Sequence, residues 1–187
     1  MLKIGYLGPE GTYSSHAAKL YDDENLKIPF KTINEVLNSL KSTDTDQVIV
    51  PLENSINGSI VEVLDFLASK NNFHIIAELN IEINHSVYSL DKMHFDNVEV
   101  VYSHPQALAQ CYDYLVDNFK NAKHKASNST ADSYNDLINS KEKGVFIGPP
   151  WMKDQEGILV VGENIQSVKN NVTRFVVISN KNINKKT

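Results

Sequence analysis

Residues 170–178 read Asn170-Asn171-Val172-Thr173-Arg174-Phe175-Val176-Val177-Ile178, and the apolar part of this run is typical of a buried strand. Before it, strand, loop and helix patterns alternate in two blocks, roughly residues 1–80 and 81–162. A last strand that follows both blocks is one way to form two lobes around a cleft. The sequence therefore predicts an α/β fold with lobe one at residues 1–80 plus 163–179, lobe two at residues 81–162, and a polar tail at residues 180–187.

The charge balance excludes some classes of partner. The net charge is −5, and the 18 Lys and Arg residues form no basic stripe, which disfavours binding to nucleic acid or to an anionic membrane. The first six residues are too polar for a signal peptide, and no apolar run approaches the roughly 20 residues of a membrane span. We therefore expect a cytoplasmic protein with no nucleic-acid and no membrane partner.

Cysteine and histidine give no sign of a metal site. Cys111 is the single cysteine and lies on an expected helix face, so a buried, inert thiol is favoured over a nucleophile. The six histidines are scattered without the spacing of metal ligands. We expect no metal and no organic cofactor, since no loop has the spacing of a nucleotide-binding motif.

Four loops that follow expected strands and precede expected helices are candidate ligand sites, because open α/β folds bind ligands there. They are Gly8-Pro9-Glu10-Gly11-Thr12, Pro51 to Ser59, Tyr102-Ser103-His104-Pro105-Gln106, and Asn128-Ser129-Thr130-Ala131-Asp132. Each can present hydroxyls or N–H groups to an anion. Each also has the composition of ordinary turns and helix caps, and His104 has the alternative of a surface residue in a first helical turn. Residue types alone leave these alternatives open.

Arg174 is the only arginine beside 17 lysines. Its guanidinium can bind a carboxylate in a planar, bidentate geometry that lysine cannot provide. Inside an apolar strand it needs an anionic partner. The candidates are a substrate carboxylate or a structural acid such as Glu53 or Glu163.

Five segments carry a resemblance to a known family. In chain order they are Gly5-Tyr6-Leu7-Gly8-Pro9-Glu10-Gly11-Thr12-Tyr13-Ser14, Val50-Pro51-Leu52-Glu53-Asn54-Ser55, Ser103-His104-Pro105-Gln106-Ala107-Leu108-Ala109-Gln110-Cys111, Ser129-Thr130-Ala131, and Glu163-Asn164-Ile165-Gln166 through Asn171-Val172-Thr173-Arg174-Phe175. Together they resemble the catalytic domain of prephenate dehydratase, from residue 2 to about residue 179. The resemblance implies two lobes similar to type II periplasmic binding proteins, a homodimer, and a lyase of phenylalanine biosynthesis that converts prephenate to phenylpyruvate without a cofactor.

The same resemblance implies roles for individual residues. Thr173 donates a hydrogen bond, or relays a proton, to the departing hydroxyl, and Arg174 holds a carboxylate or orients the Thr173 segment. The remaining candidates for substrate binding are Asn54, Ser55 and Gln106 as neutral donors, Glu53 as their support, Phe175 as a ring wall or a core residue, and Thr12, Ser129 and Thr130 in the anion-binding loops.

Two features differ from the family pattern. Pro149-Pro150-Trp151 makes a short helix there doubtful, and the chain ends where the family's regulatory ACT domain normally begins. Two other functions stay open as alternatives. One is an arogenate dehydratase, and the other is a non-catalytic sensor of a small anion on the same fold.

Overall fold

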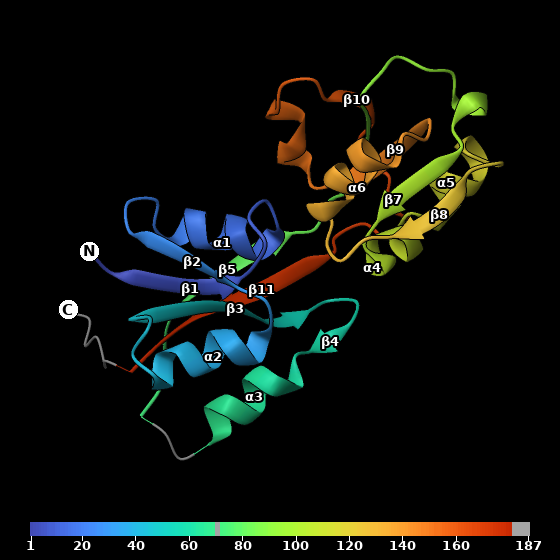
Figure 1. Ribbon diagram of the computed structural model, residues 1–187. Helices are drawn as coiled ribbons and strands as arrows, with labels where there is room; N and C mark the ends of the chain where they lie inside the picture. Colours follow the sequence, from blue (N-terminus) through green and yellow to red (C-terminus); the bar gives the residue numbers. More distant parts are fainter. Residues whose placement is uncertain (70–71, 181–187) are drawn as a thin grey trace. The chain divides into compact units, whose positions relative to one another are not determined.

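The computed structural model describes residues 1–69 and 72–180, which form two compact units. The first comprises Met1–Glu82 together with the described chain from Asn171 onward, and the second comprises Ile83–Asn170 (Figure 1). The expected α/β class with two lobes is confirmed. Residues 163–170, expected in lobe one, group with the second unit, and most of the expected polar tail, residues 181–187, lies outside the described residues.

The first unit is a sheet with helices on both faces. Its elements are β1 (Lys3–Leu7), α1 (Tyr13–Tyr21), β2 (Leu26–Phe30), α2 (Ile33–Lys41), β3 (Gln47–Asn54), β4 (Gly58–Ser59), α3 (Val61–Ala68), β5 (His74–Glu82) and β11 (Val172–Ser179). The strand order is β2-β1-β3-β11-β5, with β4 paired to β3. β1, β2 and β3 are parallel, and β11 is antiparallel to both of its neighbours.

β11 is buried on both faces, which explains its nearly continuous apolar sequence. Phe175 and Val177 pack in a cluster with residues of α1, while Val176 and Ile178 pack in another cluster with residues of α2 and α3. Figure 1 shows α1 on one side of the sheet and the other two helices on the opposite side. The last strand in the sequence is therefore the centre of the first unit's core.

The second unit is a five-stranded sheet of order β10-β6-β9-β7-β8. Its elements are β6 (Ser86–Ser89), η1 (Phe95–Asn97), β7 (Val100–Ser103), α4 (Pro105–Gln110), α5 (Tyr112–Asn118), β8 (Lys123–Ala126), α6 (Asp132–Ser140), β9 (Gly144–Gly148), η2 (Pro150–Asp154) and β10 (Leu159–Gly162). β7 is parallel to β8 and β9. One face of the sheet packs against α4 and α5, and the other packs against α6 and η2.

Helix starts show where local sequence signals hold and where tertiary contacts replace them. Thr12 caps α1 as expected. Ser59 with Glu62, and Ser103 with Gln106, have the sequence pattern of a capping box, but neither serine caps a helix. Ser59 lies in β4, and Ile60 precedes α3 without a side-chain cap. The Ser103 hydroxyl donates to the Ile147 carbonyl, and His104 caps α4 instead. The doubtful short helix forms as the 3₁₀ turn η2, since Pro150 occupies a position at its start that lacks an N–H partner.

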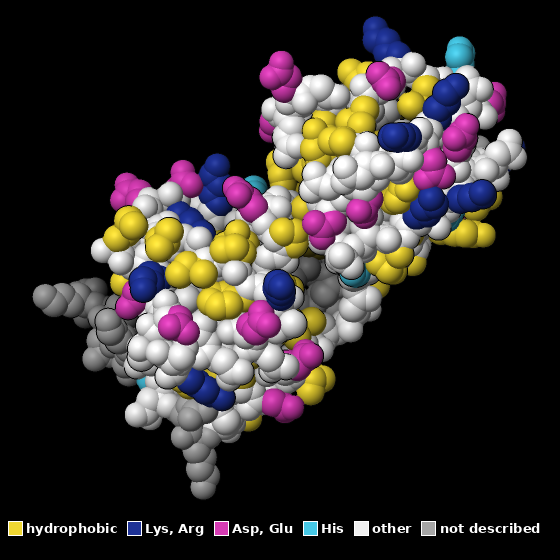
Figure 2. All heavy atoms as spheres, viewed as in Figure 1, with side chains coloured by type: hydrophobic (Ala, Val, Ile, Leu, Met, Phe, Trp, Pro, Cys, Tyr) yellow, Lys and Arg dark blue, Asp and Glu magenta, His cyan; other side chains and the backbone are white. Residues whose placement is uncertain are grey.

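Across the described ranges, no helix has both the length and the apolarity that crossing a bilayer would require. On the face drawn in Figure 2, acidic and basic side chains are interspersed on both units. This distribution agrees with the absence of a basic stripe in the sequence.

Candidate functional site

One edge of the first unit's sheet gathers the segments that the sequence singled out. β1 and β3 are parallel, so their carboxyl ends lie at the same edge, and the antiparallel β11 begins there. Asn54, the last residue of β3, pairs directly with Thr173, although the two are 119 residues apart in sequence. The fold thus brings together Asn54, Ser55 and Thr173.

Thr173 and Arg174 leave β11 on opposite faces. The pairing of β11 with β5 is regular from Val172 to Val177, so side chains alternate along this stretch. Thr173 therefore shares the α1 face with Phe175, and Arg174 shares the other face with Val176. The two neighbours in sequence have different surroundings.

Thr173 is 8% exposed, and its hydroxyl is tied to the side chain of Asn54. Asn54 Nδ2 donates to Thr173 Oγ1 at 2.9 Å and to Asn171 Oδ1 at 2.7 Å. Asn54 Oδ1 accepts from the backbone N–H groups of Ile56 and Asn57. Asn54 thus lies at the centre of a buried polar network that orients the loop after β3.

Ser55 and Thr12 both make structural contacts, Ser55 with a residue distant in sequence and Thr12 with its neighbours. Ser55 N–H donates to the Val172 carbonyl at 2.9 Å, and Ser55 Oγ accepts from Val172 N–H at 3.0 Å. Thr12 Oγ1 accepts from Ser15 N–H and donates to the Pro9 carbonyl at 2.9 Å. Ser55 extends the pairing of β3 and β11, and Thr12 caps α1.

Arg174 forms a bidentate ion pair with Glu78 of β5, an acid that the sequence interpretation did not consider. Arg174 Nε lies 3.1 Å from Glu78 Oε2, and Nη2 lies 2.6 Å from Glu78 Oε1. The Arg174 guanidinium lowers the pKa of the Glu78 carboxyl, chiefly through these hydrogen bonds. The side chains are 41% and 46% exposed, so solvent reaches both groups.

Glu53 and Phe175 lie beside this pair and in the core, respectively. Glu53 is exposed and pairs with Arg174 in the β3–β11 register. The pKa of Arg174 is raised chiefly by its hydrogen bonds to Glu78 and by the Glu78 charge, and the charge of Glu53 adds to this. Phe175 is 2% exposed and packs in the cluster under α1. Of the two alternatives for Phe175, the structure places it in the core.

The second unit holds the other predicted binding residues at the carboxyl ends of β7 and β8. Gln106 is exposed in the first turn of α4. Ser129 Oγ accepts from Asp132 N–H at 2.9 Å and donates to Asp132 Oδ2 at 2.8 Å, in the turn before α6, whose N-cap residue is Ala131. The Thr130 carbonyl accepts from Ser133 Oγ.

Two titratable groups near α4 have shifted pKa values because of burial. Burial raises the pKa of the Cys111 thiol to about 12, so the thiol stays protonated and inert, as the sequence predicted. Burial lowers the pKa of His104, whose Nδ1 accepts from Gln106 N–H at 3.3 Å. His104 therefore caps α4 as a neutral imidazole.

The family model of prephenate dehydratase matches residues 4–183. The chain belongs to the prephenate dehydratase family. The match covers both units and every residue of the polar network around Thr173.

Individual members of the family are similar to this chain over nearly its whole length. The bifunctional chorismate mutase/prephenate dehydratase of Buchnera aphidicola subsp. Schizaphis graminum is 35% identical, over 97% of this chain and 48% of its own length. The prephenate dehydratase of Methanocaldococcus jannaschii is 34% identical, over 94% of this chain and 64% of its own length. The crystal structure of prephenate dehydratase from Arthrobacter aurescens, in complex with L-Phe, gives a TM-score of 0.84 at 26% identity, over 97% of this chain and 60% of that one. The chain thus spans less than two thirds of the length of each of these three proteins.

Sequence reasoning missed two buried residues of the segments that resemble the prephenate dehydratase family. Asn171 lies in the last family segment and was assigned no role from the sequence, yet it is 3% exposed and accepts from Asn54 Nδ2. Ser103 is fully buried and holds the Ile147 carbonyl at the end of β9. The signal for Asn171 was an amide directly before a buried strand, but its partner is distant in sequence.

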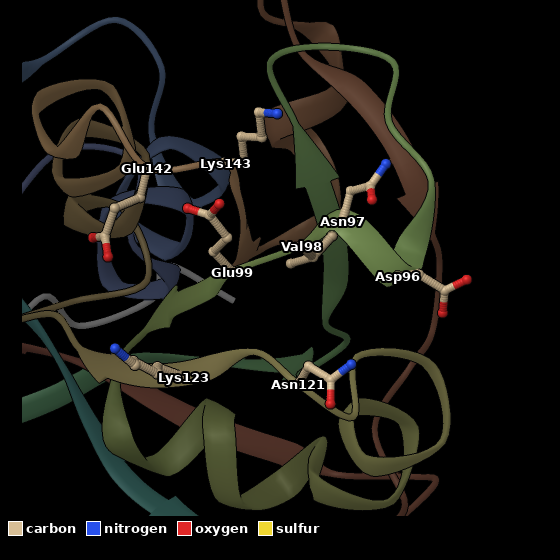
Figure 3. Close-up of a pocket in the computed structure, with 8 residues that line it drawn as sticks. All are labelled: Asp96, Asn97, Val98, Glu99, Asn121, Lys123, Glu142 and Lys143. Carbon is tan, nitrogen blue, oxygen red and sulfur yellow. The ribbon is translucent and has the colours of Figure 1, made fainter.

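A pocket of about 450 Å³ in the second unit lies apart from these family segments. Its lining residues lie in η1, in the segments directly before β7, β8 and β9, and at the first residue of β8, which is the sheet edge opposite to Gln106 and Ser129 (Figure 3). Glu99 and Glu142 line it together with Lys123 and Lys143, so it has no single sign of charge. Among the residues that the structure describes, no three His, Cys, Asp or Glu side chains are grouped to hold a metal ion.

Proposed function

We propose that the protein is a prephenate dehydratase, which converts prephenate to phenylpyruvate, carbon dioxide and water. The observation that carries this proposal is the buried Thr173 hydroxyl, which accepts a hydrogen bond from Asn54 Nδ2 and donates none within residues 1–69 and 72–180. The family membership of the chain supports the choice of substrate.

The reaction requires a hydrogen-bond donor for the departing hydroxyl, and it does not require a strong base. The bond from the ring to its carboxylate breaks, its electron pair enters the ring, and the carbon–oxygen bond across the ring breaks with the departing hydroxyl. Prephenate dianion plus one proton gives phenylpyruvate monoanion, carbon dioxide and water. The proton must reach the departing oxygen, and Thr173 is proposed to donate a hydrogen bond to it in a site where burial strengthens such bonds.

Arg174 is proposed to bind a carboxylate of the substrate in exchange for Glu78. Its pair with Glu78 is half-exposed, and exposed ion pairs are weak and easily replaced. The fork of donors that now holds Glu78 fits a substrate carboxylate equally well. Because Thr173 and Arg174 leave the strand on opposite faces, the proposal gives them separate tasks.

In the second unit, Gln106 is the strongest candidate for a neutral donor to the substrate. Its side-chain amide is exposed and makes no hydrogen bond within the described part of the chain. Ser129, whose hydroxyl is bonded to Asp132, and Thr130 are proposed to act beside it.

The test is turnover of prephenate and of arogenate by the purified protein, with and without a metal chelator. We expect phenylpyruvate from prephenate in both conditions, and we expect Thr173→Ala to lower kcat by about 10² or more while KM changes little. Thr173→Ser, which keeps the hydroxyl, is the matched control. Full turnover by the alanine variant contradicts the role of Thr173, and tight binding of prephenate without turnover by the wild type supports the sensor.

A further inference from the structure

Asn171 lies directly before β11 and is buried next to the proposed catalytic threonine. Its Oδ1 accepts from Asn54 Nδ2 at 2.7 Å, the shortest of the three hydrogen bonds from that amide nitrogen. Asn54 Nδ2 also donates to Thr173 Oγ1, at 2.9 Å, so this amide links Asn171 to the threonine. The effect of Asn171 on the threonine passes through Asn54.

The orientation of the Asn54 amide is fixed by groups that can only donate. Asn54 Oδ1 lies 3.1 Å from Ile56 N and 3.0 Å from Asn57 N. Backbone N–H groups have no acceptor, so the atom facing them must be the amide oxygen. The amide NH₂ of Asn54 therefore faces Asn171 and Thr173.

That NH₂ group has two hydrogens and two close acceptors. One hydrogen goes to Asn171 Oδ1 and the other to Thr173 Oγ1 at 2.9 Å. With one lone pair of Thr173 Oγ1 occupied, the threonine O–H is directed away from Asn54. The backbone N–H groups of Ile56 and Asn57 thus fix the donor direction of the Asn54 amide toward Asn171 and Thr173. As a result, the Thr173 hydroxyl accepts from Asn54 and directs its own hydrogen elsewhere.

We propose that Asn171 is a positioning residue of the reaction, which aims the hydrogen of Thr173 at the departing hydroxyl by holding the Asn54 amide in this orientation. The proposal rests on the proposed function for its effect on turnover. Without the Asn171 oxygen, one Asn54 N–H is buried without its acceptor. Asn54 Oδ1 still accepts from the Ile56 and Asn57 N–H groups, so the amide tilts about that end, and its free hydrogen moves toward the Val172 carbonyl, 3.4 Å from Nδ2. Thr173 then loses its fixed donor, and its hydroxyl rotates among several directions.

The experiment compares Asn171→Leu, which keeps the shape and removes the acceptor, with Asn171→Asp, which keeps an acceptor oxygen. We expect Asn171→Leu to lower kcat about tenfold to 10²-fold, as for a misaligned catalytic group, with KM within about threefold of the wild type. Asn171→Asp is expected to retain most of kcat. In the Thr173→Ala background, Asn171→Leu is expected to cause no further loss, because the group that it positions is already absent. Full kcat for Asn171→Leu, or an equal loss with and without the Thr173 hydroxyl, overturns the proposal.

A second measurement is made on the wild-type protein alone and does not depend on turnover. Exchange of the two Asn54 side-chain amide hydrogens with solvent, followed by NMR in the wild type without substrate, is expected to be slow for both hydrogens. Fast exchange of both overturns the proposal even if the protein turns over prephenate. Slow exchange in a protein that does not turn over prephenate contradicts the proposed function but supports the orientation of the Asn54 amide described above.

Discussion

At the scale of single residues, the pair of Arg174 and Glu78 is the interaction that determines the outcome of substitutions at either position. Its two hydrogen bonds join residues 96 apart in sequence, on neighbouring strands. Both side chains are partly solvated, so solvent screens the pair and it contributes little to stability. Arg174 can therefore release Glu78 and bind a substrate carboxylate at little cost in stability.

We expect Arg174→Lys to raise KM for prephenate about tenfold, because an ammonium cannot form the bidentate contact to a carboxylate. Glu78→Gln, which removes only the resting partner, is the matched control and is expected to stay within about threefold of the wild-type kcat/KM. Steady-state kinetics of the two variants and of the double variant decide this. Equal losses in both single variants, without further loss in the double variant, make the arginine a structural support of β11.

At the scale of elements, α1 shows a helix start that its own sequence determines. Thr12 lies directly before the helix and accepts from Ser15 N–H, and its one hydroxyl hydrogen is shared between the Pro9 carbonyl at 2.9 Å and the Leu7 carbonyl at 3.3 Å. All these partners are within five residues, so local sequence contains the whole interaction. The same contacts commit the Thr12 hydroxyl to the helix start.

Thr12→Ala is expected to lower the free energy of unfolding by about 1 kcal/mol, the usual cost of losing a helix cap, with KM for prephenate changed by less than about threefold. Thr12→Ser keeps the hydroxyl and is expected to unfold like the wild type. Urea denaturation followed by circular dichroism, together with steady-state kinetics, gives both quantities. A large rise in KM without loss of stability indicates direct substrate binding by Thr12.

Elements that depend on distant partners were beyond the reach of the sequence. The strand pattern of residues 173–178 was readable, but its place between β3 and β5 follows from pairing with residues that lie about a hundred positions away. Ser103 has the sequence position of a helix cap, but its hydroxyl bonds to the Ile147 carbonyl, which only the folded sheet brings close to it. For the candidate site, Thr173 and Asn54 were predictable from the family segments, whereas Asn171 and Glu78 required coordinates.

At the scale of the whole molecule, the two units differ in how the chain builds them. The second unit is one continuous segment, residues 83–170. The first unit needs two segments, because β11 pairs with both β3 and β5. Only the second unit has all of its strands within one stretch of chain.

We expect residues 83–170, expressed alone, to fold, and residues 1–82 alone to stay unfolded or to aggregate. The reason is that removal of β11 leaves one side of β3 unpaired and takes away the strand that joins β5 to the sheet. Dispersion of amide signals in NMR spectra and a cooperative thermal transition are the readouts. A folded fragment 1–82 shows that β11 is dispensable for the first unit.

The late position of β11 also has a consequence during translation. The ribosome completes β1, β3 and β5 before it starts the whole second unit, and β11 follows only after that. At ordinary elongation rates the nascent first unit waits roughly ten seconds for its central strand. During this interval, its exposed strand edges are a target for chaperones, and slow codons in the second unit would lengthen the exposure.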